Sequence, residues 1–99
     1  MTDNDEIVLC CFLWAREGEA DGLTAYEDRV LAMVQRHRGE VIQRVVSDGA
    51  DGRPHEVQLY RFSDRAALDA YLADPDRLAL TTERDRVIAR TELFPVTLR

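Results

Sequence analysis

The sequence predicts an α+β domain in which two strand–helix–strand units share one four-stranded antiparallel sheet. Four apolar runs are typical of strands, and an amphipathic segment follows the first and the third of them. Right-handed crossovers return each following strand to the same sheet, which gives the order β-α-β-β-α-β with both helices on one face. We expect the 99 residues to form one domain. The predicted strands are residues 6–14, 41–46, 56–62 and 91–98.

The first predicted strand is apolar throughout, IVLCCFLW from Ile7 to Trp14. Its β-branched and aromatic residues favour a strand. The adjacent Cys10 and Cys11 point to opposite faces of a strand, so they cannot pair with each other. Two reduced, buried thiols are typical of a cytoplasmic protein, and this is the predicted location.

The first predicted helix begins near Leu23, with apolar residues recurring at spacings of three and four. It runs for about 15 to 18 residues. Arg36 and Arg38 favour its C-terminus by their charge, and Gly39 is predicted to take the left-handed conformation that stops it.

The second half of the sequence predicts a hairpin, a helix and an edge strand. Two Asp-Gly pairs in residues 47–54 indicate the turn before the third strand. Ser63 is the predicted N-cap of the second helix. Asp74-Pro75 either ends this helix or starts a short one, and Asp76 to about Arg86 forms a further helical segment. Pro95 favours an edge position for the last strand, which leaves the first and third strands central.

One face of this sheet presents a conflict. With both helices on the other face, an antiparallel sheet exposes its second face to water and should be polar there. Strand one instead offers apolar side chains on both faces. A second copy of the chain, related by two-fold symmetry, would cover the open face and predicts a homodimer. The alternative is a central strand that tolerates apolar residues on both sides.

Composition excludes several classes of function. A net charge of −6 argues against nucleic acid and against an anionic membrane surface. The first apolar run follows an acidic start rather than a basic one and is too short to span a bilayer, so we expect neither a signal peptide nor a membrane segment. All 13 basic residues are Arg, which indicates a GC-rich bacterial genome and excludes Schiff-base or P-loop lysine chemistry.

Two stretches carry a resemblance to a known family. They are AYEDRV at 25–30 leading into HRGEV at 37–41, and YRFSDRAAL at 60–68 leading into AYLADP at 70–75. Together with the βαββαβ order, they resemble the ferredoxin-like dimeric α/β-barrel superfamily. That superfamily includes antibiotic-biosynthesis monooxygenases, haem-degrading monooxygenases, muconolactone isomerase-like enzymes and many uncharacterised small proteins. The resemblance covers almost the whole chain and implies a homodimer whose two sheets close into a barrel.

Departures from the family pattern narrow the expected chemistry. Antibiotic-biosynthesis monooxygenases commonly carry a His where this chain has Tyr71. Haem-degrading members use an Asn, a Trp and a His together. Here the only Asn is Asn4, in the N-terminal tail, and the only Trp is Trp14, in strand one. The sequence therefore disfavours haem degradation, and no cofactor is predicted.

The two histidines are candidates for different roles. His37 could act as a general base, because the pKa of an unperturbed imidazole lies near neutrality. In the last turn of a helix it could equally complement the helix dipole or pack its ring. His55 is expected to be exposed beside the turn before strand three. With no third ligand near them, no metal site is predicted.

Aromatic residues and one arginine form the predicted pocket. Trp14, Tyr26, Tyr60 and Tyr71 could converge between the helices and the sheet and line a pocket for an aromatic ligand. Arg61 could bind a carboxylate or an enolate there. The alternatives are a core with a few large residues and an arginine that reaches to solvent.

Two functions remain open. The resemblance implies a cofactor-independent monooxygenase, or a related proton-transfer enzyme, acting on a small aromatic or polyketide-like molecule. His37, Tyr71 and Arg61 would then be its catalytic residues. The alternative is a non-catalytic dimeric module that binds a small ligand or serves a structural role. An open cavity holding a His or a Tyr–Arg pair favours the enzyme, and a filled core with no inward titratable group favours the module.

Overall fold

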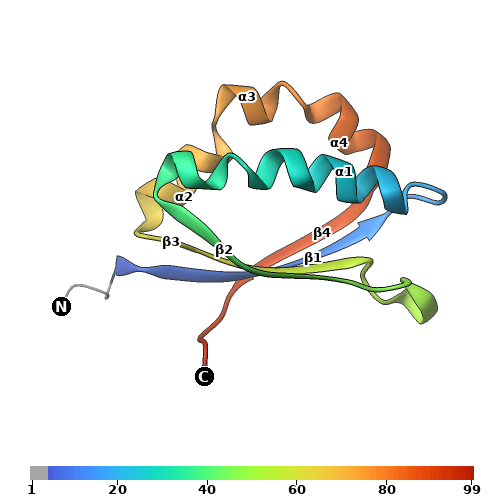
Figure 1. Ribbon diagram of the computed structural model, residues 1–99, viewed down its shortest axis with the longest axis horizontal. Helices are drawn as coiled ribbons and strands as arrows, with labels where there is room; N and C mark the ends of the chain where they lie inside the picture. Colours follow the sequence, from blue (N-terminus) through green and yellow to red (C-terminus); the bar gives the residue numbers. More distant parts are fainter. Residues whose placement is uncertain (1–4) are drawn as a thin grey trace.

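The computed structural model describes residues 5–99 and has the predicted topology. Its sheet has four antiparallel strands in the order β2-β3-β1-β4, so β1 and β3 are central and β2 and β4 form the edges. The α-helices lie over one face of the sheet (Figure 1). The elements are β1 (Ile7–Ala15), α1 (Ala20–Leu31), η2 (Val34–His37), β2 (Gly39–Val46), η3 (Ala50–Gly52), β3 (Glu56–Phe62), α2 (Arg65–Leu72), α3 (Pro75–Leu78), α4 (Thr81–Val87) and β4 (Ile88–Pro95).

The first helical region differs from the predicted single helix. It ends at Leu31 and is followed by the short 3-10 turn η2. The residue with the left-handed backbone is Arg38, at φ 58°, and not Gly39. Gly39 serves close packing instead, because a Cβ there would lie 2.6 Å from both the Phe62 ring and the Val34 side chain.

The second helical region also differs in its boundaries. The N-cap of α2 is Asp64 rather than Ser63, because the Asp64 carboxylate accepts a 2.8 Å hydrogen bond from the Ala67 amide. Asp74 caps the new short helix α3, with Pro75 in its first turn. The segment predicted from Asp76 onward divides into α3 and α4, and β4 begins at Ile88, three residues before the predicted start at residue 91.

The core lies between the helices and the inner face of the sheet. Leu9, Cys11 and Leu13 point into it from β1, and Tyr26 and Val30 meet them from α1. Both cysteines are free and buried, as predicted. Burial raises the pKa of the Cys11 thiol to about 12, so this thiol stays protonated at neutral pH.

The outer face of the sheet is apolar over its centre. Its central side chains come from alternate positions of β1, β3 and β4, and they are Val8, Cys10, Phe12, Trp14, Val57, Leu59 and Phe94. The Phe12 ring packs edge-on against Phe94 at a centroid distance of 5.2 Å and against Trp14 at 6.1 Å. Within residues 5–99, no helix or strand covers this face (Figure 1).

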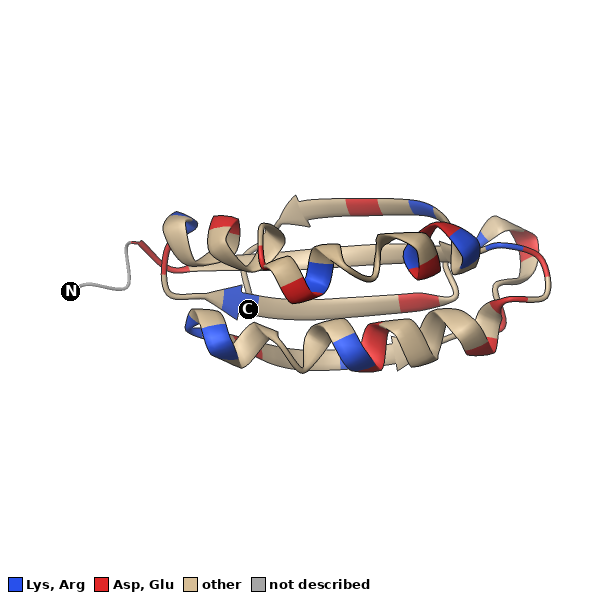
Figure 2. Ribbon diagram, turned by 90° about the horizontal axis from the view of Figure 1, so that it is seen from above, with Lys and Arg blue, Asp and Glu red and all other residues tan. Residues whose placement is uncertain are grey.

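Charge is distributed mainly over the helices and connections. Acidic and basic residues occur along the helices and the connections, while most of the length of the strands carries neither (Figure 2). None of the helices in the described part of the chain is long and apolar enough to cross a membrane.

Candidate active site

A cavity of about 60 Å³ lies between the helices and the inner face of the sheet. This volume exceeds the roughly 10–15 Å³ that a cavity needs in order to hold one water molecule. It therefore suits a small molecule, or one end of a larger one that extends through the mouth. The lining residues are Cys11, Leu13, Glu27, Val30, Leu31, Gln58, Tyr60, Tyr71, Leu72, Arg77, Arg84, Ile88, Thr91 and Leu93.

Glu27 is a carboxylate on the wall of this cavity. It projects from α1 with only 6% of its surface exposed. Its Oε1 accepts a 2.9 Å hydrogen bond from the Gln58 side-chain amide. Burial raises the pKa of Glu27, and the neighbouring charge of Glu56 adds to the effect, while the bond from Gln58 opposes it. A buried carboxylate with a raised pKa on a cavity wall has the properties of a candidate general base.

A chain of polar contacts behind Glu27 holds it in place. The Gln58 amide nitrogen also donates to Glu56 Oε2 at 2.9 Å, so it bridges the two carboxylates. Arg44 Nε donates to the same Glu56 oxygen at 2.7 Å, and Arg44 Nη1 donates to Asp28 at 2.6 Å. The arginine therefore compensates Glu56, whereas no cation among residues 5–99 forms an ion pair with Glu27.

Two arginines bring positive charge to the cavity wall. The Arg77 guanidinium lies over the Tyr71 ring, 5.0 Å from its centroid, and Nη1 donates a long 3.4 Å bond to the Leu72 carbonyl. Arg77 Nε is buried and has no hydrogen-bond partner in the described part of the chain. Arg84 donates to the Thr91 hydroxyl at 3.3 Å. The same cavity thus contains cations and a carboxylate.

Two tyrosines complete the polar part of the lining. Tyr71 donates a buried 3.2 Å hydrogen bond to the Val30 carbonyl, and burial raises its pKa to about 12. Burial also raises the pKa of Tyr60 above its usual range. Both hydroxyls therefore stay protonated at neutral pH and can act as hydrogen-bond donors but not as bases.

The structure brings together only part of the predicted pocket. Tyr60 and Tyr71 line the cavity, whereas Tyr26 packs in the core with 1% of its surface exposed. Trp14 and Arg61 lie on the outer face of the sheet. The Trp14 indole donates to the Gly52 carbonyl at 2.8 Å, and Arg61 forms an ion pair with Glu40 at 3.2 Å. The period of two along β1 and β3 explains this separation.

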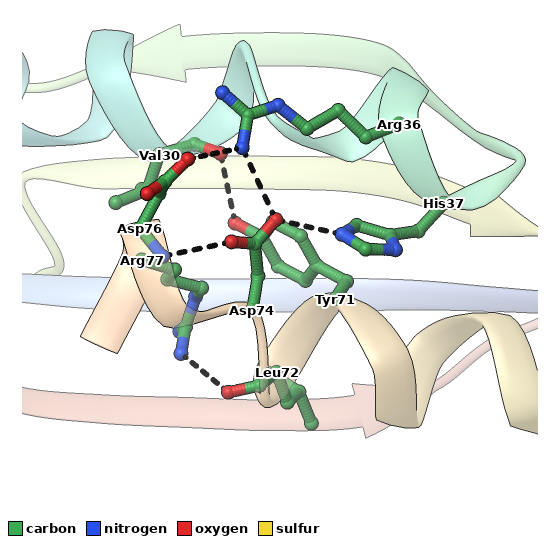
Figure 3. A network of polar contacts seen from close by, with 8 residues as sticks. All are labelled: Val30, Arg36, His37, Tyr71, Leu72, Asp74, Asp76 and Arg77. Carbon is green, nitrogen blue, oxygen red and sulfur yellow. Dashed lines mark hydrogen bonds and ion pairs between the residues drawn. The ribbon is translucent and has the colours of Figure 1, made fainter. Parts of the chain in front are cut away.

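His37 is not among the residues that line the cavity, and its side chain contacts Asp74 in a polar network (Figure 3). Its Nε2 lies 2.8 Å from Asp74 Oδ2, an oxygen to which Arg36 also donates at 3.3 Å. The other Asp74 oxygen accepts from the Asp76 amide. The hydrogen bond with His37 is the main cause that lowers the pKa of Asp74. This network ties η2 to the start of α3.

The remaining candidates occupy structural positions or lie outside the described residues. His55 is half-buried rather than exposed, because its Nδ1 accepts a 3.1 Å hydrogen bond from the Ala15 amide. Residues 5–99 contain no group of three His, Cys, Asp or Glu side chains that could hold a metal ion. Asn4 lies outside the described residues.

The sequence analysis missed Glu27, Gln58 and Arg77, although two of them carried a signal. Glu27 lies four residues after Leu23 and three before Val30, so it falls on the apolar stripe of its helix. Gln58 lies between Val57 and Leu59 in β3, so its side chain is on the opposite face from theirs and on the same face as that of Tyr60. Polar residues at core-facing positions are rare enough to mark a site. Arg77 lies in a segment whose helix boundaries the sequence did not define.

No protein-family model matches the chain. No curated protein matches it either.

Several solved structures have a fold similar to that of this chain, although their sequence identity to it is low. The cofactor-independent oxygenase SnoaB from Streptomyces nogalater is 20% identical, with a TM-score of 0.71 over 96% of this chain and 94% of that one. A putative antibiotic biosynthesis monooxygenase from Bacteroides thetaiotaomicron is 16% identical, with a TM-score of 0.76 over 97% and 91%. A dimeric ferredoxin-like protein of unknown function from Bacteroides fragilis is 6% identical, with a TM-score of 0.72 over 94% and 96%. The chain has the ferredoxin-like α+β fold of these proteins, and the predicted resemblance is confirmed at that level.

Proposed function

We propose that the chain is a small general-base enzyme that needs no cofactor. The observation that carries the proposal is Glu27, a buried carboxylate with a raised pKa on the wall of a cavity that also contains Arg77 and Arg84. A base of this kind takes a proton from a carbon acid or a phenol, and the arginines stabilise the anion that results. A cavity that holds a Tyr–Arg pair is also the feature that the sequence analysis set as favouring an enzyme.

The anion has two possible fates. Reprotonation at another position gives an isomerisation. Reaction of an activated CH₂ group with oxygen gives a carbonyl and water, and the four electrons that the carbon loses are the four that O₂ accepts, so no external reductant is needed. The similarity in fold to SnoaB, a cofactor-independent oxygenase, supports the second fate.

Aromatic or polyketide-like molecules are the proposed substrates. Leu13, Ile88 and Leu93 provide an apolar lining beside Tyr60 and Tyr71. Because the cavity has a volume of about 60 Å³ and is partly open to solvent, the reacting end of such a molecule would enter it and the rest would extend outside. The buried free thiols support the predicted cytoplasmic location.

Hydrogen–deuterium exchange tests the proton transfer. 2-Indanone, a small aromatic ketone with activated CH₂ groups, is incubated with the protein in D₂O while proton NMR follows loss of the CH₂ signal. We expect the wild-type protein to accelerate exchange and Glu27→Gln to remove about 10²-fold or more of the protein-dependent rate. Glu17→Gln, at an exposed position, is the matched control. An oxygen electrode on the same samples separates the two fates of the anion.

Two results would contradict the enzyme. One is a wild-type rate no faster than buffer, and the other is a Glu27→Gln rate equal to that of the wild type. The small volume of the cavity favours a second candidate, a non-catalytic ligand-binding module. Binding of 2-indanone without any acceleration of exchange would favour that module.

We also propose that a second copy of the chain covers the outer face of the sheet. The apolar side chains at the centre of that face support a two-fold dimer, and the Bacteroides fragilis neighbour is described as dimeric. Leu59→Arg places a charge at the centre of the face and is expected to give a monomer in analytical ultracentrifugation. Leu78→Arg, at a half-exposed leucine on α3, should leave the dimer intact. A monomeric wild-type protein would refute this assembly.

A further inference from the structure

We infer that the cavity takes a small carboxylic acid, with the carboxylate of the ligand bound by Arg77 and Arg84. This inference names the substrate class of the proposed enzyme and therefore rests on the proposed function. It adds a requirement that the proposed function lacks, namely that the molecule carries a negative charge before it reacts.

The first observation is the incomplete hydrogen bonding of Arg77. A guanidinium has five N–H donors, and this one makes a 3.4 Å contact to the Leu72 carbonyl and a side-chain contact to Tyr71, which leaves most of its donors without a partner among residues 5–99. Its Nε is buried without a partner among residues 5–99. A buried donor left unpaired is costly, so such groups normally have a partner. A ligand carboxylate in the adjoining cavity would provide one.

The second observation is that cation and carboxylate share the cavity without pairing. Arg77 and Glu27 both line it, yet no ion pair joins them in the described part of the chain. Glu27 is held by Gln58 instead, and Arg77 is held over the Tyr71 ring. Each charged group therefore remains available to a different part of one ligand. A carboxylic acid with an activated C–H group offers its carboxylate to the arginine and its carbon-bound proton to Glu27.

The third observation is a second cation on the same lining. Arg84 reaches it from α4, and its recorded side-chain hydrogen bond goes to Thr91, which also lines the cavity. Two guanidinium groups and a hydroxyl can surround a carboxylate, which accepts up to four hydrogen bonds. Arg84 also lies 4.0 Å from the Asp85 carboxylate, so a ligand anion would add to this pairing. Hydrogen bonds from a guanidinium are stronger to a charged carboxylate than to a neutral carbonyl, so the site favours an anion over a neutral ligand.

The inference is tested on the wild-type protein with two matched probes. Benzoate and benzamide have the same number of non-hydrogen atoms and nearly the same shape, and they differ in charge. Titrations followed by ¹⁵N-resolved NMR are expected to show benzoate binding at least about tenfold more tightly than benzamide, with shifts at cavity residues. Equal affinities, or no binding of benzoate, would overturn the inference without any variant having to fold.

Variants then assign the charge that is recognised. Arg77→Gln should weaken benzoate binding about tenfold and leave benzamide unchanged. Arg65→Gln alters the net charge equally at an exposed position on α2 and should change neither affinity. A well-folded Arg77→Gln protein with undiminished benzoate affinity would refute the assignment.

The same titration separates this inference from the proposed enzyme. Glu27→Gln should keep or tighten benzoate binding, because it removes a like charge from the cavity. The exchange assay is repeated with phenylpyruvate, which carries both a carboxylate and an activated CH₂ group. Benzoate bound by a protein that accelerates exchange of neither phenylpyruvate nor 2-indanone would leave the acid site standing and refute the base. Exchange of neutral 2-indanone without any preference for benzoate would refute the acid site alone.

Discussion

Replacing Glu27 by Gln should stabilise the protein, and the gain should grow with pH. Glu27 is 6% exposed and bound by one neutral side chain, Gln58, so its ionised form is poorly compensated. Burying an ionised carboxylate costs several kcal/mol, of which one hydrogen bond to a charged group offsets about 1.5–3 kcal/mol. A net gain of about 1–3 kcal/mol follows for Glu27→Gln at pH 8.5.

The sign follows from the direction of the shift in pKa. The pKa of Glu27 in the folded state lies above its ordinary value of 4.5. Below pH 4.5 the carboxyl is protonated in both the folded and the unfolded state, so its ionisation costs the folded state no stability. As pH rises through the raised pKa, the buried carboxyl has to ionise, and the folded state loses stability. The gain from Glu27→Gln should therefore be near zero at pH 4.5 and greatest at pH 8.5. Thermal melts at both pH values measure it, at roughly 4–8 °C per kcal/mol for a domain of this size.

Glu17→Gln is the matched control, since this exposed carboxylate should give no gain at either pH. A Glu27→Gln protein that is less stable than the wild type at pH 8.5 would show that the carboxylate is well compensated. That result would refute the reasoning that makes Glu27 a base.

Three further predictions concern other parts of the fold. Gly39→Ala should cost about 2–3 kcal/mol in urea denaturation, because the added methyl group meets two fully buried side chains at 2.6 Å, and a loss below 1 kcal/mol would contradict that packing. Asp74→Asn should destabilise the protein at pH 7, and this loss of stability should shrink as pH falls through the lowered pKa of Asp74. An equal loss of stability at pH 7 and pH 2.5 would exclude the charge of Asp74 as the source of the effect. Cys11 should resist iodoacetamide at pH 8 until urea is added, as mass spectrometry would show, because burial raises its thiol pKa to about 12.

The sequence was sufficient for the topology because each element carried its own periodic signal. The alternation along β3 and the apolar β1 specified two central strands, and Pro95 marked an edge. The helix ends were less well predicted. Arg38 rather than Gly39 takes the left-handed turn, because Gly39 is needed where the Phe62 ring approaches the backbone. That contact between distant segments leaves no local pattern in the sequence.

The candidate site was predicted in part, and the reason is the face on which each residue lies. Tyr60 and Tyr71 line the cavity, and Trp14 and Arg61 lie on the opposite face of the sheet. Period-two alternation already separated Trp14 from Leu13, yet large aromatic side chains drew more attention than the polar Gln58 on the core-facing side. Arg77 required the tertiary structure, because its position over Tyr71 depends on the break between α2 and α3.

Direct titration of the Glu27 carboxyl tests the central claim most closely. Carbon-13 NMR of selectively labelled protein can follow this carboxyl from pH 3 to pH 9, with Glu56→Gln and Glu27→Gln spectra to assign the signals. We expect a midpoint clearly above 4.5, which falls when the like charge of Glu56 is removed. A midpoint at or below 4.5 would mean that Glu27 is an ordinary ionised carboxylate, and the proposed base would have to be abandoned.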